Sequence, residues 1–85
     1  MNMDLMLNHI TYKKYKTMRK SIEFYECEHG GDLENYLSDM RDCGATIISS
    51  YVDSEDEIGY VTYEVENSDD FIYKFINTEA YEFVN

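Results

Sequence analysis

The 85-residue chain has a formal net charge of −11, yet 44% of its residues are hydrophobic and nine are tyrosines. This length predicts one domain, residues 1–85, with a modest core, and the hydrophobic content argues against disorder. No apolar run reaches the roughly 18 residues that a membrane-spanning helix needs. The two cysteines are too few for a disulfide framework, so we expect a cytoplasmic protein.

The charge is unevenly distributed along the chain. Residues 1–20 hold five basic and one acidic side chain, a net charge of +4, whereas residues 21–85 hold two basic and 17 acidic side chains, a net charge of −15. Such an acidic body repels nucleic acid and anionic membranes and attracts basic proteins. We therefore expect a basic protein as partner and no membrane contact, with solubility alone as the alternative explanation.

The first 20 residues are expected to form a basic arm or an extra strand. Aromatic side chains are interspersed among basic ones there, a combination that can bind RNA by stacking and phosphate contact. The alternative is an exposed strand whose lysines protect a sheet edge or pair with the acidic body. The candidate residues of the arm are Tyr12, Lys13, Lys14, Tyr15, Lys16, Arg19 and Lys20.

The first confidently predicted strand spans residues 21–28 and places Ile22 and Phe24 on one face. Two glycines follow, and Asp32 is expected to be the N-cap of a helix over residues 32–43. A glycine directly after this helix suits the left-handed conformation that ends it. Its apolar face consists of residues at helical spacing, namely Leu33, Tyr36, Leu37 and Met40.

Two further strands are predicted over residues 46–52 and 60–65, which are rich in β-branched and aromatic residues. Four carboxylates in five residues lie between them, and their mutual repulsion predicts an exposed turn. On the first of these strands the buried face is less clear, and Ile48 and Val52 are expected in the core. On the second strand, alternation places Val61, Tyr63 and Val65 inward and Tyr60, Thr62, Glu64 and Glu66 outward.

A second helix is predicted from the N-cap Ser68, with an apolar stripe of Phe71, Ile72, Phe75 and Ile76. Residues 80–84 then predict a short strand, with a continued helix as the alternative. This order of elements resembles the ferredoxin-like split βαβ unit. The resemblance is topological and implies an α+β fold over residues 21–85, with two helices on one face of an antiparallel sheet. It implies no functional residues, because this fold hosts many functions.

Neither a metal site nor a catalytic site is expected. Cys27, His29, Cys43 and His9 lack the close cysteine pairs of zinc ribbons and fingers. The intervening helix would also separate the two thiols by roughly 16 Å. The acidic turn lacks the glycine and distal glutamate of a calcium loop. Since no nucleophile motif or phosphate-binding loop is present either, we expect a protein that is not an enzyme and needs no cofactor.

In size, acidity and absence of a catalytic motif, the chain resembles phage-encoded anti-defence proteins. These include anti-CRISPR proteins, anti-restriction DNA mimics and antagonists of toxin–antitoxin ribonucleases. The resemblance implies an inhibitor whose target is a host nuclease or nucleic-acid-binding complex. Dense carboxylates suit a basic cleft that normally holds phosphates, and an exposed tyrosine suits an interface anchor. The candidate partner-binding residues are Asp53, Glu55, Asp56, Glu57, Tyr60, Glu64 and Glu66.

Two alternative functions follow from the same sequence. In one, the arm binds RNA while the acidic body inhibits a toxin ribonuclease that is bound to that RNA. In the other, the chain is a small oligomeric ferredoxin-like module with a structural or ligand-binding role. A homodimer would then form at a sheet edge or over an open sheet face.

Overall fold

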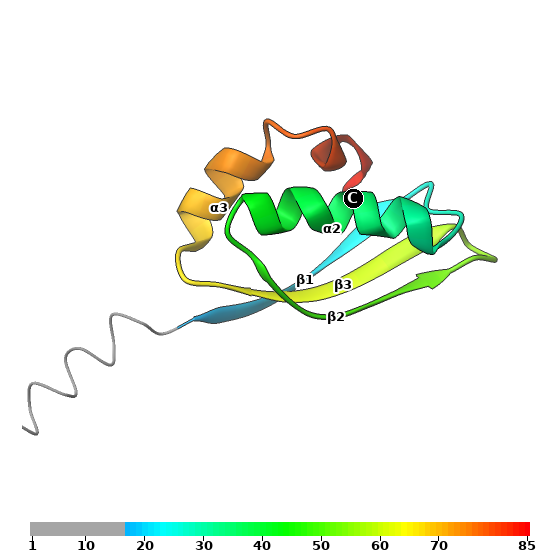
Figure 1. The fold of residues 1–85 in the computed structure, drawn as a ribbon, viewed down its shortest axis with the longest axis horizontal. Coiled ribbons are helices and arrows are strands. Elements are labelled where there is room, and N and C mark those ends of the chain that lie inside the picture. Colours follow the sequence, from blue (N-terminus) through cyan, green and yellow to red (C-terminus); the bar gives the residue numbers. More distant parts are fainter. Residues whose placement is uncertain (1–16) are drawn as a thin grey trace, which may run out of the picture.

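The computed structural model describes residues 17–85, which form one three-stranded antiparallel sheet and two helices (Figure 1). The predicted arm residues Tyr12, Lys13, Lys14, Tyr15 and Lys16 lie outside the described residues. The elements in chain order are β1 (Met18–Tyr25), α2 (Gly30–Asp42), β2 (Thr46–Asp53), β3 (Ile58–Val65), α3 (Ser68–Phe75) and the 3₁₀ helix η1 (Ala80–Phe83).

Strand β3 lies at the centre of the sheet and pairs antiparallel with both β1 and β2. Strands β1 and β2 therefore run in the same direction, and α2 connects them across the sheet. Both helices lie on the same face of the sheet (Figure 1). The predicted α+β class and antiparallel sheet are confirmed. The complete ferredoxin-like order is not confirmed, because the sheet has three strands in the order β1-β3-β2.

The predicted fourth strand at residues 80–84 is wrong. Residues 80–83 form η1, and only Val84 joins the sheet, through a single antiparallel bridge to Phe24. The amides of Tyr81 and Glu82 donate to carbonyls three residues earlier, at 3.3 and 3.1 Å. These local hydrogen bonds satisfy the backbone without a neighbouring strand. Apolar residues two apart over so short a stretch do not distinguish a strand from such a turn.

The core lies between the sheet and the two helices. The inward-facing residues of β3 are confirmed, since Val61, Tyr63 and Val65 are all nearly fully buried. Phe24 of β1 stacks on Tyr36 of α2, with ring centroids 4.6 Å apart. The predicted apolar face of α2 is also confirmed, and its four residues belong to the same core cluster.

Two residues of β2 were predicted in the core, and the prediction is wrong for one of them, Ile48. A β-bulge between Ile47 and Ser49 interrupts the pairing with β3, and Ile48 is 43% exposed. A bulge adds one residue to a strand and so shifts its inward and outward alternation. As a result Ile47 packs against the core in place of Ile48, together with the correctly predicted Val52.

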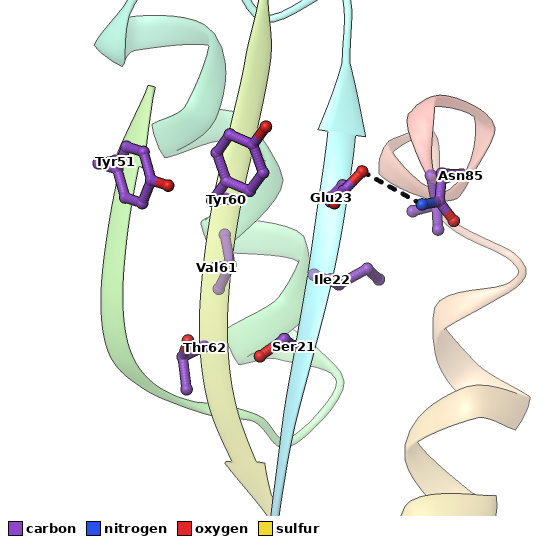
Figure 2. Close-up of a pocket in the computed structure, with 9 residues that line it drawn as sticks. Ser21, Ile22, Glu23, Tyr51, Tyr60, Val61, Thr62 and Asn85 are labelled. Carbon is purple, nitrogen blue, oxygen red and sulfur yellow. Dashed lines mark hydrogen bonds between the residues drawn. The ribbon is translucent and has the colours of Figure 1, made fainter. Parts of the chain in front are cut away.

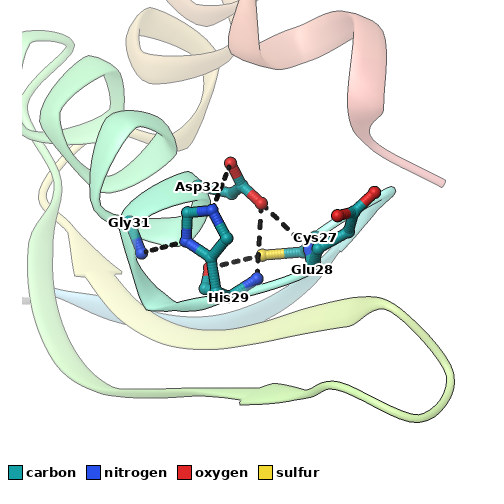
Figure 3. A network of polar contacts seen from close by, with 5 residues as sticks. All are labelled: Cys27, Glu28, His29, Gly31 and Asp32. Carbon is teal, nitrogen blue, oxygen red and sulfur yellow. Dashed lines mark hydrogen bonds and ion pairs between the residues drawn. The ribbon is translucent and has the colours of Figure 1, made fainter.

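Both observed N-caps precede the predicted ones, by three residues in α2 and by one residue in α3. His29 is the N-cap of α2, and its Nδ1 accepts a hydrogen bond from the Gly31 amide at 3.0 Å (Figure 3). Asp32 lies in the first turn instead, where its Oδ2 accepts from the amides of Glu28 and His29. Aspartate is common at N-caps and histidine is not, so a prediction from residue preference selected Asp32 in place of His29.

Helix α3 begins after Asn67, whose Oδ1 accepts from the Asp70 amide at 2.9 Å, so Ser68 is not the cap. The predicted apolar stripe of α3 is only partly buried. Phe71 and Phe75 lie in the core, whereas the isoleucines at positions 72 and 76 are nearly half exposed. The helix is eight residues long and contributes one aromatic residue per turn to the core.

Candidate functional site

The β2–β3 turn has a defined backbone conformation that presents its carboxylates to solvent. Asp53 Oδ1 accepts hydrogen bonds from the amides of Glu55 and Asp56, at 3.1 and 3.2 Å. Glu57 adopts a left-handed conformation with φ of 59°. Glu55, Asp56 and Glu57 are all exposed, and none of them forms an ion pair with residues 17–85.

A second acidic loop lies against this turn. The Cys27 amide donates to the Glu57 carbonyl at 2.8 Å, which joins the β1–α2 loop to the turn. Both loops lie at the same end of the molecule (Figure 1). Glu26 and Glu28 of the β1–α2 loop are exposed. We name this region the acidic end and define it by Glu26, Glu28, Asp32, Asp53, Glu55, Asp56 and Glu57.

The lysines and arginines of residues 17–85 lie away from the acidic end, whereas His29 lies within it, with its Nε2 3.7 Å from Asp32 Oδ1. Arg19 and Lys20 begin β1, whereas Arg41 and Lys74 lie in the last turns of α2 and α3. Three of them form ion pairs, and each pair neutralises one carboxylate. The pairs are Arg19–Glu64 at 2.9 Å, Arg41–Glu34 at 2.9 Å and Lys74–Asp70 at 3.2 Å.

The structure therefore divides the predicted partner-binding residues into two groups. The four carboxylates of residues 53–57 lie at the acidic end, without a lysine or arginine in either loop. Glu64 and Glu66 lie at the other end of β3, where Glu64 pairs with Arg19, a residue that we predicted in the basic arm. Lys20, the other described arm residue, is half-buried in β1. We conclude that Arg19 and Lys20 belong to the sheet.

Aromatic side chains lie on the sheet face that the helices leave uncovered. Tyr51, Tyr60 and Glu23 occupy neighbouring register positions on β2, β3 and β1 (Figure 2). The rings of Tyr51 and Tyr60 stack with centroids 4.9 Å apart. Partial burial, followed by the nearby charge of Glu23, raises the pKa of Tyr60. Tyr60 thus faces outward as predicted.

These residues line a groove of about 510 Å³ between the outer sheet face and the end of the described chain. Ser21, Thr62 and Asn85 complete its polar lining (Figure 2). Glu23 and Tyr51 are not among the site residues predicted from the sequence. Alternation along β1 and β2 indicated that they share the face of Tyr60, but only the strand register places them side by side.

Both cysteines are buried and free, and they lie at opposite ends of α2. Among residues 17–85, no group of three or more histidine, cysteine or carboxylate side chains is arranged to hold a metal ion. Within the same part of the chain, no helix is long and apolar enough to cross a membrane.

The buried thiols are expected to resist alkylation in the folded protein. Burial, followed by the Asp32 carboxylate, raises the pKa of Cys27, and burial followed by Asp39 raises that of Cys43. A raised pKa lowers the fraction of reactive thiolate, and burial blocks the reagent. We expect labelling by iodoacetamide at pH 8 to be at least ~100-fold slower than in the unfolded chain. Mass spectrometry of timed samples measures this, and labelling at the unfolded rate would contradict the burial of both thiols.

Comparisons of the chain with protein-family models, with curated proteins and with solved structures found no match. The class of this protein is therefore described by its fold and its candidate site alone. They describe a small α+β protein whose acidic end holds no lysine or arginine from residues 17–85, with an aromatic groove on its open sheet face.

Proposed function

We propose that the chain is a non-enzymatic inhibitor that binds a basic, nucleic-acid-binding protein through its acidic end. The target class is a host defence nuclease or a related complex in the bacterial cytoplasm, as expected for a phage-encoded anti-defence protein. The observation that carries the proposal is the meeting of two acidic loops, joined by the hydrogen bond from Cys27 to Glu57. Seven carboxylates gather there, and the described lysines and arginines lie elsewhere.

The distribution of charge supports binding to a basic surface more strongly than the net charge does. Residues 17–85 carry 17 acidic and four basic side chains, and three of the four bases are already paired. The hydrogen bonds that Asp53 accepts order the backbone of the turn, from which several closely spaced carboxylates project, as phosphates do along one edge of a nucleic acid. A turn whose backbone is already ordered also loses less conformational freedom on binding than a mobile loop does.

We also propose that the fold is ferredoxin-like, with the fourth strand shortened to a single bridge. The central position of β3, the parallel direction of β1 and β2, and the connection through α2 support this proposal. The single bridge between Phe24 and Val84 stands where a fourth strand would pair with β1. The fold provides a rigid support for the two acidic loops, and it assigns no chemistry of its own.

Affinity capture from a bacterial lysate tests the proposal. The tagged chain is expected to retain a basic nucleic-acid-binding protein, and added duplex DNA or RNA is expected to release it. High salt should release it as well, because interactions between exposed charges are screened. Retention of no partner, or only of neutral proteins that nucleic acid does not displace, would contradict the proposal.

A matched pair of variants tests whether the captured partner binds at the acidic end. In the first variant Glu55→Gln, Asp56→Asn and Glu57→Gln neutralise the turn. In the control, Asp42→Asn, Glu66→Gln and Glu79→Gln remove the same charge from exposed positions elsewhere. We expect the first variant to lose the partner and the control to retain it. Equal losses would show that total charge, and not the acidic end, determines binding.

A further inference from the structure

The groove on the open sheet face combines a flat aromatic surface with one oriented carboxylate. Tyr60 is half-buried and stacks on Tyr51, so its ring is held in place. Glu23 lies beside it on β1. The Tyr25 hydroxyl and the Asn85 amide both donate to Glu23 Oε1, each at 3.3 Å (Figure 2 shows the Asn85 contact). Within residues 17–85, the hydrogen bonds to this carboxylate reach Oε1 only, which leaves Oε2 without a hydrogen-bond donor among these residues.

We propose that this groove binds an arginine side chain of the basic partner, and this inference rests on the function proposed above. A guanidinium group is planar, carries a permanent positive charge and presents several N–H donors in its plane. It can stack on the Tyr60 ring while it donates to Glu23 Oε2, so one group satisfies both features of the groove. The surrounding carboxylates of the acidic end favour a cation over an anion at this position.

Lysine and nucleobases fit the groove less well. The ammonium of lysine is a compact charge that gains from the carboxylate but cannot stack as a plane. A nucleobase can stack on the tyrosines, as bases do on aromatic sheet faces, but its attached phosphate meets the repulsion of Glu23 and the acidic end. Arginine is also enriched in the tightly bound centres of protein interfaces.

NMR titration of the full ¹⁵N-labelled chain tests this inference. The probes are two short peptides of equal charge, one with three arginines and one with three lysines, and a short single-stranded DNA. We expect the arginine peptide to shift the amides of Glu23, Tyr51 and Tyr60 and to bind about fivefold more tightly than the lysine peptide. The variants Tyr60→Leu and Glu23→Gln should abolish this preference. Tyr73→Leu, on a residue that is 72% exposed on α3, is the control and should retain it.

The possible outcomes separate this inference from the proposed function. Equal affinity for both peptides, or shifts that are confined to the acidic end, would overturn the arginine site and leave the acidic end as a binding surface. Shifts at Tyr51 and Tyr60 with the DNA would also overturn it, in favour of base stacking. If neither peptide shifts any residue, both the arginine site and the function of the acidic end are wrong.

Discussion

Reversing the three exposed charges of the β2–β3 turn is expected to weaken binding to the basic partner by about 100-fold or more. The variant carries Glu55→Lys, Asp56→Lys and Glu57→Lys. Each substitution removes an attraction at the interface and replaces it by a repulsion, and exposed pairs of this kind each contribute modestly. The fold should persist, because these side chains are exposed and Asp53 still accepts the hydrogen bonds that organise the turn. Isothermal titration calorimetry at two salt concentrations measures the loss.

The control for this prediction reverses three exposed charges elsewhere, with Asp42→Lys, Glu66→Lys and Glu79→Lys. It changes the net charge equally but leaves the acidic end intact. Circular dichroism should give the same spectrum for both variants and the unchanged chain. An affinity that falls equally in both variants would mean that the acidic end has no special role, and an unchanged affinity in the first would mean that the turn is only solvated.

Replacement of Phe24 by alanine is expected to destabilise the fold by about 3–5 kcal/mol. Phe24 is fully buried, stacks on Tyr36 of α2 and contacts the edge of the Phe75 ring of α3, with ring centroids 6.4 Å apart. It therefore connects the sheet to both helices. The total stability of a small domain is about 5–15 kcal/mol, so much of it would be lost. Urea unfolding followed by circular dichroism measures the change in the free energy of unfolding.

Tyr73→Ala provides a matched aromatic-to-alanine control, because Tyr73 is 72% exposed and lies on α3. Its effect should stay within about 0.5 kcal/mol. A loss of less than about 1 kcal/mol for Phe24→Ala would contradict the central position of this ring in the core.

The sequence predicted the elements whose periodicity is regular. The apolar residues of α2 recur without interruption, and Val61, Tyr63 and Val65 alternate cleanly along β3, so their buried faces were correct. The errors occur where one local feature changes the period. The bulge at Ile48 shifts the faces of β2, and η1 replaces a strand because hydrogen bonds three residues apart satisfy its backbone. Neither feature has a strong signal in a single sequence.

Only part of the candidate site could be predicted from the sequence. The turn at residues 53–57 was apparent from its composition, but Glu26 and Glu28 are distant in sequence and join it only through the pairing of β1 with β3. The same register brings Glu23 beside Tyr60. Conversely, Glu64 was assigned to the acidic surface although Arg19 neutralises it across the strand pair. Contacts between strands depend on register, which composition and spacing do not specify.

Competition between nucleic acid and the chain for the captured partner tests the central claim most directly. The partner's affinity for the chain is measured at increasing concentrations of the DNA or RNA that the partner normally binds. If the acidic end occupies the nucleic-acid site, the apparent Kd for the chain rises in proportion to the nucleic acid concentration. An apparent Kd that stays constant while the partner is saturated with nucleic acid would show that the two bind at separate places, and would contradict the account.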